Sequence, residues 1–265
     1  MQELSKENLK QIHKLKTEKE REKEGKFLIE GLHLCQEALT SDWELELVLH
    51  SGEFSESSAG QRLVEEFSKR GIEAFGIKKK ELEKLADTET PQGIMAVVKK
   101  KKFALSRDFL KDSSLLLGLD NIRDPGNLGT MIRTADAVGA DAVLLSKGCV
   151  ELYNPKVVRS TMGSIFHLPV IENLDLPEVI PDLKKDGFRI TVSEVHEGKD
   201  YTEVSYPEKS CLIIGSEASG ISQQILNLAD VRIKIPILGK AESLNASVAA
   251  GILLYEMVRN KKGTS

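Results

Sequence analysis

The stretch LLLGLDNIRDPGNLGTMIRTADAVGADAVLL, residues 115–145, contains the pattern that decides the fold. Its two ends, at 115–119 and 142–145, are short apolar runs typical of strands that are buried on both faces. Between them, residues 128–138 have apolar side chains at helical spacing. A strand, a helix and a strand in this order predict two parallel strands joined by a helix, the repeating unit of α/β proteins.

The same alternation continues to the end of the chain. Apolar segments predict strands at Phe188–Val192, Leu212–Ile214 and Val231–Ile235, and helices at Pro155–Met162 and Ser247–Val258. We therefore predict an α/β domain of residues 113–265 whose parallel sheet is covered on both faces. Ligands of such sheets bind outside the carboxyl ends of the strands, so the loops at those ends are where chemistry is expected.

The first half of the chain predicts a smaller α/β domain, residues 1–105. Its expected elements are an exposed helix at 5–21, strands at 27–29, 45–49, 72–75 and 93–98, and helices near 34–38, 63–69 and 80–85. The mostly polar stretch 106–114 is expected to be a linker between the two domains.

The net charge of the 265 residues is −4, whereas nucleic-acid-binding proteins usually carry an excess of basic residues. The lysines are bunched, however, at 78–80 and 99–102. Such bunching can create a local positive field on an acidic protein, although a lysine run is also common on a solvated edge. Charge alone therefore leaves a nucleic-acid partner open.

Neither a membrane span nor a secretion signal is expected. No apolar run approaches about 20 residues, and Met1–Lys26 has no apolar core. Three scattered cysteines do not make a disulfide framework, and the five histidines show no metal-ligand spacing. We expect a cytoplasmic protein that needs no metal.

The first loop at a strand end reads DNIRDPGNLG, residues 120–129. Asp124 followed by Pro125 is typical of a helix start with aspartate as the N-cap. The helix that follows has its apolar side chains on one side and Arg133 on the other. An arginine in this position is usually solvated, but a glycine-containing helix start with free N–H groups also suits a phosphate.

The second loop reads GSEASGIS, residues 215–222. It matches a P-loop only at its outer positions, because Ile221 stands where a lysine is needed and Glu217 would repel a triphosphate. A glycine-flanked carboxylate suits a ligand with a cationic or hydroxyl-bearing part. Taken alone, the loop is also explained as a tight strand-to-helix turn.

The third loop reads IPILGKAESLNAS, residues 235–247, and precedes the last helix. Ser243, Asn245 and Ser247 bring three small hydrogen-bonding side chains together. Helix capping accounts for one of them, and all three are more than a cap requires.

Together, and in this order, the three loops resemble those of the SPOUT superfamily, in its tRNA/rRNA 2′-O-ribose methyltransferase branch. The resemblance covers residues 113–260, and the joint occurrence is specific although no single loop is. The matching residues are Asn121, Asp124, Pro125, Asn127, Gly129, Arg133, Ala135 and Gly139, then Arg159, Ser160, Gly163 and His167, then Gly215, Ser216, Glu217 and Gly220, and finally Pro236, Ser243, Leu244, Asn245 and Ser247.

Residues 1–105 show a weaker resemblance to the RNA substrate-binding domain that is often fused to these enzymes, a fold similar to small ribosomal RNA-binding proteins. The matching residues are Phe27, Glu30, Gly31, Thr90, Gln92 and Gly93. We therefore expect this domain and its lysine runs to supply most of the affinity for RNA. A fused domain of this kind also favours ribosomal RNA over tRNA as the substrate.

The resemblance implies an S-adenosylmethionine-dependent RNA 2′-O-ribose methyltransferase, a homodimer whose site is built from both subunits. It also implies a deep trefoil knot in the C-terminal domain, which general rules of chain topology would not predict. The expected cofactor-binding residues are Gly215, Glu217, Gly220, Ile235 and Leu244, and the expected catalytic residues are Asn127, Arg133, Glu217, Ser243 and Asn245.

A ribose 2′-hydroxyl is a poor nucleophile until its proton is removed or strongly shared. The family proposal makes Arg133 the base, but a free guanidinium has a pKa above about 12. We expect Arg133 mainly to bind the neighbouring phosphate and hold the 2′-hydroxyl. Asn127 and Ser243 would orient these groups, Asn245 would shape the site, and Glu217 would support the loops.

Three alternatives remain at this point. A tRNA is a second possible substrate, and a base nitrogen is a second possible methyl acceptor. A non-catalytic RNA-binding or ribosome-assembly factor on the same scaffold is the alternative from another functional class.

Overall fold

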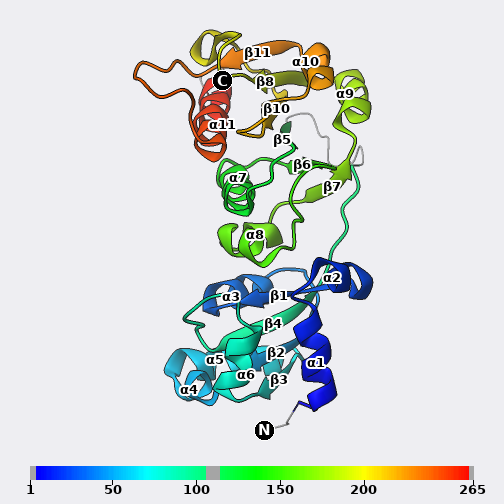
Figure 1. The fold of residues 1–265 in the computed structure, drawn as a ribbon, viewed down its shortest axis with the longest axis vertical. Helices are drawn as coiled ribbons and strands as arrows, with labels where there is room; N and C mark the ends of the chain where they lie inside the picture. Colours follow the sequence, from blue (N-terminus) through cyan, green and yellow to red (C-terminus); the bar gives the residue numbers. More distant parts are fainter. Residues whose placement is uncertain (1–3, 106–113, 263–265) are drawn as a thin grey trace. The chain divides into compact units, whose positions relative to one another are not determined.

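A computed structural model describes residues 4–105 and 114–262 of the chain (Figure 1). The chain forms two compact units, each built on a sheet with helices, which confirms the predicted α/β class. Unit 1 consists of residues 1–101 and 153–166, and unit 2 of residues 102–152 and 167–265.

The units differ in one segment from the predicted continuous domains 1–105 and 113–265. Residues 153–166 belong to unit 1, although the sequence analysis assigned them to the second domain. Most of the predicted linker at 106–114 lies outside the described residues. In the described part of the chain, no helix is long and apolar enough to cross a membrane.

The sheet of unit 1 has four strands in the order β1-β4-β2-β3. These are β1 (Lys26–Glu30), β4 (Ile94–Lys99), β2 (Leu45–His50) and β3 (Glu73–Gly76). Strand β4 is antiparallel to both of its neighbours, whereas β2 and β3 run parallel. The helices are α1 (Lys6–Lys14), α2 (Glu18–Glu24), α3 (Leu32–Thr40), α4 (Gly52–Glu56), α5 (Ser58–Lys69) and α6 (Lys79–Leu85).

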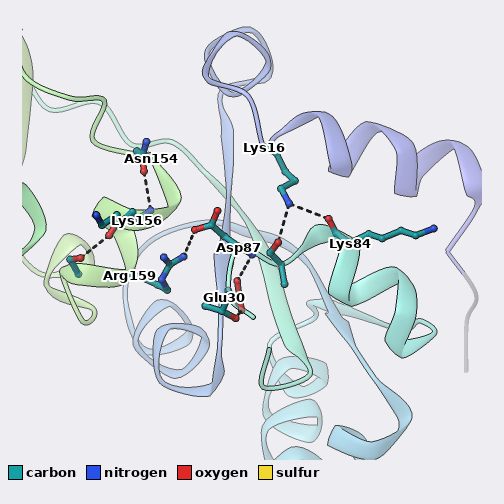
Figure 2. A network of polar contacts seen from close by, with 10 residues as sticks. Lys16, Glu30, Lys84, Asp87, Asn154, Lys156 and Arg159 are labelled. Carbon is teal, nitrogen blue, oxygen red and sulfur yellow. Dashed lines mark hydrogen bonds and ion pairs between the residues drawn. The ribbon is translucent and has the colours of Figure 1, made fainter. Parts of the chain in front are cut away.

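The N-terminal region forms two helices, so the prediction of one exposed helix at 5–21 was wrong. Arg21 is only 3% exposed, and its guanidinium donates to the carbonyl oxygens of Leu15 (3.0 Å) and Lys16 (2.8 Å). The chain between α1 and α2 therefore curls around a buried arginine. Lys16 in turn donates to the carbonyls of Lys84 and Ala86 at the end of α6 (Figure 2).

Residues 153–166, which include α8 (Pro155–Ser160), complete the core of unit 1. The Tyr153 ring lies 4.7 Å from that of Phe27, and Trp43 lies 5.4 Å from Phe166. All four side chains are buried, and the Tyr153 hydroxyl donates to the carbonyl of Lys101 at 2.9 Å. An aromatic cluster therefore ties this segment to the N-terminal part of the chain.

Polar contacts reinforce the same attachment, as Figure 2 shows. The Arg159 guanidinium at the end of α8 lies 2.6 Å from the Asp87 carboxylate. The backbone N–H of Asp87 donates to Glu30 at 2.9 Å, which holds that loop against β1. His33 Nε2 lies 3.0 Å from the carbonyl of Met162.

The lysine run at 99–102 is largely engaged within unit 1. Ion pairs join Lys99 to Glu44 (2.5 Å), Lys100 to Glu22 (2.7 Å) and Lys101 to Asp42 (2.6 Å). Neighbouring carboxylates therefore offset much of this positive charge. The prediction that the run attracts RNA stays a prediction. The paired carboxylates reduce the positive charge that these lysines can offer to RNA.

The attachment of residues 153–166 makes a prediction about stability. Tyr153→Ala should lower the free energy of unfolding by about 3 to 5 kcal/mol, because it empties an aromatic site in the core. Tyr153→Phe, which removes only one hydrogen bond, should cost about 1 kcal/mol. Trp43 is the single tryptophan, so its fluorescence during denaturant titration reports on this cluster. Identical curves for all three proteins would contradict the role given to the segment.

Unit 2 contains a seven-stranded sheet in the order β7-β6-β5-β10-β8-β11-β9, with every pair parallel. The strands are β5 (Ser114–Asp120), β6 (Ala142–Ser146), β7 (Val170–Leu174), β8 (Arg189–Ser193), β9 (Lys199–Asp200), β10 (Lys209–Gly215) and β11 (Val231–Lys234). The predicted parallel sheet is confirmed. From β5 the chain builds outward through β6 and β7 and then crosses to β8 and β9 on the other side, and β10 later fills the place between β5 and β8. This reversal is the type of place where such sheets bind ligands.

Helices cover both faces of this sheet, with α7 and α11 together on one side and α9 and α10 on the other (Figure 1). They are α7 (Pro125–Ala137), α9 (Leu176–Lys185), α10 (Gln223–Leu228) and α11 (Ala246–Lys262). The sequence analysis missed β7, α9 and α10. Pro177 and Pro181 obscured α9, although a proline in the first helical turn is well tolerated.

Candidate active site

The first and second loops start side by side because β5 and β10 are paired. Their register places Gly215 opposite Asp120 at the carboxyl ends of the two strands. The Asp120 carboxylate is 4% exposed and accepts from Asn121 Nδ2 (3.0 Å) and from the backbone N–H of Ser222 (2.9 Å). A buried carboxylate that accepts hydrogen bonds from both loops holds them together.

Asn127 connects all three loops through its side-chain amide. Its Nδ2 donates to Glu217 Oε1 in the second loop, and its Oδ1 accepts from Asn245 Nδ2 in the third at 3.0 Å. The N-cap Asp124 accepts from the backbone N–H of Asn127 at 2.8 Å, which fixes the start of α7. Three expected catalytic residues thus form one chain of hydrogen bonds, in which Asn127 contacts partners 90 and 118 positions away.

Asn245 is also the cap of α11. Its Oδ1 accepts from Ser247 Oγ (2.6 Å) and from the backbone N–H groups of Ser247 (2.9 Å) and Val248 (3.2 Å). Two of the three small polar side chains therefore serve the helix start. Ser243 makes no such contact and instead lines the cavity described next.

An open cavity of about 420 Å³ lies at the ends of β8 and β10 and beside the third loop. Of the expected cofactor residues, Gly215, Glu217, Gly220 and Leu244 line it. The end of β8 and the loop after it, residues 193–197, form another part of the wall that was not predicted from the sequence. This segment, SEVHE, has no recognisable motif, and the signal for it is its place at a strand end.

Gly215 is required by close packing and Gly220 by backbone conformation. A Cβ at Gly215 would lie 2.3 Å from the carbonyl carbon and oxygen of Gly220, far inside contact distance. Gly220 has open space around it but a φ of +63°, which favours glycine. The loop between them closes through the Gly220 N–H, which donates to the Ser216 carbonyl at 2.9 Å.

Acidic side chains surround the cavity on two sides. Glu194 is 16% exposed and faces Arg232 at 3.8 Å, and Glu197 lies 3.5 Å from the same guanidinium. Glu217 contributes a carboxylate from the second loop. The surroundings therefore suit a ligand that carries a positive centre and hydroxyl groups.

Two expected residues lie apart from this arrangement. Ile235 lines a neighbouring cavity of about 680 Å³ that shares only Val195 and His196 with the first. Arg133 is exposed on α7, six positions after Asn127, and its side chain forms no hydrogen bond or ion pair with the residues that the structure describes. Arg133 therefore lies on a different face of α7 from the Asn127 contacts.

Comparisons with known proteins identify both halves of the chain. Residues 114–255 match the SpoU rRNA Methylase family, and residues 6–96 match the MRM3-like substrate binding domain. The 23S rRNA (guanosine(2553)-2′-O)-methyltransferase RlmP of Bacillus subtilis is 38% identical over 95% of this chain and 96% of its own length.

Solved structures agree over nearly the whole length. The SpoU methyltransferase AviRb from Streptomyces viridochromogenes, in complex with AdoMet, has a TM-score of 0.86 at 27% identity and covers 97% of this chain and 99% of its own. An AdoMet-bound rRNA methyltransferase from Sinorhizobium meliloti has the same TM-score at 28% identity, with 98% and 97% covered.

The close packing of Gly215 makes a prediction about the cavity. Gly215→Ala should lower the affinity for S-adenosylmethionine at least tenfold, because the added methyl group must displace the Gly220 backbone. Isothermal titration calorimetry measures this affinity directly. Gly52→Ala is the control, since a Cβ there meets nothing within 4 Å. Unchanged binding by a folded Gly215→Ala protein would show that the ligand does not depend on this loop.

Proposed function

Because the chain belongs to the SpoU rRNA methylase family, it is an RNA 2′-O-ribose methyltransferase that uses S-adenosylmethionine, and we propose that its substrate is ribosomal RNA. The observation that carries the assignment of the site is the Asn127 amide, which bonds to both other loops beside a glycine-walled cavity. A match to an rRNA enzyme along nearly the full chain, substrate-binding domain included, supports ribosomal RNA over tRNA.

The residues around the cavity fit S-adenosylmethionine. The space beside Gly215 is of the size that small-molecule ligands fill, and a side chain at Gly215 would not fit there. Glu194 and Glu217 suit the cofactor's ribose hydroxyls and its positive sulfonium centre. When bound, this group supplies a methyl already activated for transfer.

The chain's own residues have to bind and orient the 2′-hydroxyl and accept or share its proton. Asn127 is fixed by Glu217 and Asn245, so it presents its remaining hydrogen-bonding capacity in one orientation. Ser243 lines the cavity and is free to donate to the nucleotide. We propose that Arg133 binds the phosphate next to the methylated ribose and holds the 2′-hydroxyl. An exposed guanidinium without a carboxylate partner is available to an anion.

Arg133 lies on a different face of α7 from the Asn127 contacts, which supports a homodimer in which each site takes groups from both copies. Val248 and Tyr255, which lie two turns apart on α11, leave apolar side chains 51% and 58% exposed. An exposed apolar stripe on a long helix is typical of a surface that binds another protein. We propose a second copy of the chain as its partner.

Several further assignments follow from the family. Residues 113–265 would form the methyltransferase domain with its trefoil knot, and residues 1–105 would bind the substrate RNA. Residues 153–166 would belong to the methyltransferase domain in sequence while packing with the substrate-binding domain. The cytoplasm, where ribosomal RNA is modified in bacteria, would be the place of action.

Mapping of 2′-O-methyl groups on ribosomal RNA, from cells with and without the gene, tests the proposal. One missing methyl group that the purified protein restores is the expected result. Loss of a methyl group only from a tRNA would replace the substrate proposal, and no change in any RNA would support a non-catalytic factor.

Replacement of Arg133 tests its assignment. Arg133→Ala should leave cofactor affinity nearly unchanged and slow methyl transfer by about a hundredfold, the scale of a positioned catalytic group. Arg133→Lys should recover little, because an ammonium lacks the planar fork that grips a phosphate. Nearly full activity of the lysine variant in single-turnover assays would show that methyl transfer does not need the planar guanidinium group.

The proposed dimer predicts the effect of a charge on α11. Tyr255→Asp should shift the protein from dimer to monomer in sedimentation velocity, because it buries a carboxylate in an apolar contact. Lys185→Gln, on the exposed side of α9, lowers the net charge by the same one unit and should leave the dimer intact. A dimeric Tyr255→Asp protein would exclude this face of α11.

A further inference from the structure

Helix α7 carries an acidic residue one turn beyond Arg133. Asp136 follows at the i,i+3 spacing, at which side chains of opposite charge on a helix normally meet. No other charged residue of α7 lies three or four positions from Arg133. Left to itself, the helix would therefore favour an ion pair between the two.

The structure shows the Asp136 carboxylate in a different contact. Its Oδ2 lies 3.2 Å from Nδ1 of His167, and the two side chains are 30% and 44% exposed. Nδ1 carries a proton in one neutral tautomer and in the imidazolium, so His167 can donate to the carboxylate in either form. Arg133 has no carboxylate within ion-pair distance among the described residues.

We propose that His167 holds the Asp136 carboxylate away from Arg133, so that the guanidinium stays free for the RNA. His167 would then be a positioning residue for the methyl transfer, acting on Arg133 through Asp136 without touching the substrate. The inference rests on the proposed role of Arg133 in binding the phosphate and the 2′-hydroxyl.

The expected size of the effect follows from the exposure of these groups. An ion pair between solvent-exposed side chains on one helix is weak, and its formation would lower the fraction of free Arg133 by about 1.5- to twofold. The same weak attraction explains why one hydrogen bond from a histidine is enough to compete with it. Loss of His167 should therefore impair methylation measurably, but far less than loss of Arg133.

The experiment compares full-length His167→Ala, Asp136→Asn, the double variant and His167→Asn in single-turnover methylation of ribosomal RNA at saturating S-adenosylmethionine. His167→Ala should slow the reaction about 1.5- to twofold. Asp136→Asn and the double variant should stay close to the wild-type rate, because no carboxylate is left to capture Arg133. His167→Asn should also stay close, since its amide N–H can replace the Nδ1 donor.

The double variant decides the question. If the contact merely stabilised the fold, the double variant would be as slow as His167→Ala, which would overturn the proposal. Equal thermal midpoints for the four proteins together with recovery in the double variant would support it. Arg133→Ala in the same assay tests the role of Arg133 separately from that of His167. Full activity of Arg133→Ala would refute the assigned role of Arg133 itself.

Discussion

The side-chain amide of Asn127 is the contact on which the active-site arrangement depends. It donates to Glu217 and accepts from Asn245, so one residue at the start of α7 connects loops that are about a hundred positions apart. Each loop is also anchored at its own base, the first two by Asp120 and the third by the capping of α11. An amide can do this because it offers a donor and an acceptor at once, which neither an aspartate nor a leucine of similar size provides.

Two glycines of the second loop lie in the wall of the cavity beside these loops. Gly215 and Gly220 approach so closely that no Cβ fits at the first position, and the parallel pairing of β10 with β5 brings that position next to Asp120. Glu194 and Glu197 from the segment after β8 and Glu217 from the second loop add carboxylates to this wall, and Arg232 faces the first two.

The family domain and the compact units do not share their boundaries. Residues 153–166 lie within the part of the chain that matches the methyltransferase family, yet their aromatic side chains complete the core around Phe27 and Trp43. The ion pair between Arg159 and Asp87 adds a polar contact to this attachment. A fragment cut at the linker would therefore expose apolar surface in both pieces, so the two activities, RNA binding and methyl transfer, are best tested in the full chain.

The sequence by itself determined the α/β class, most strands and helices, and the capped start of α7, because these depend on local periodicity and on the neighbouring Asp124 and Pro125. The three loop motifs also identified most of the residues that gather at the candidate site. Only the tertiary structure decided the strand order, the wall formed by residues 193–197, the partners of the lysine run and the contact of His167 with Asp136. Those features depend on which distant segments become neighbours, and pairing across a hundred positions leaves no periodic signal in the chain. The same limit explains why residues 153–166 were assigned to the other domain. Their aromatic side chains indicate burial but do not indicate in which core.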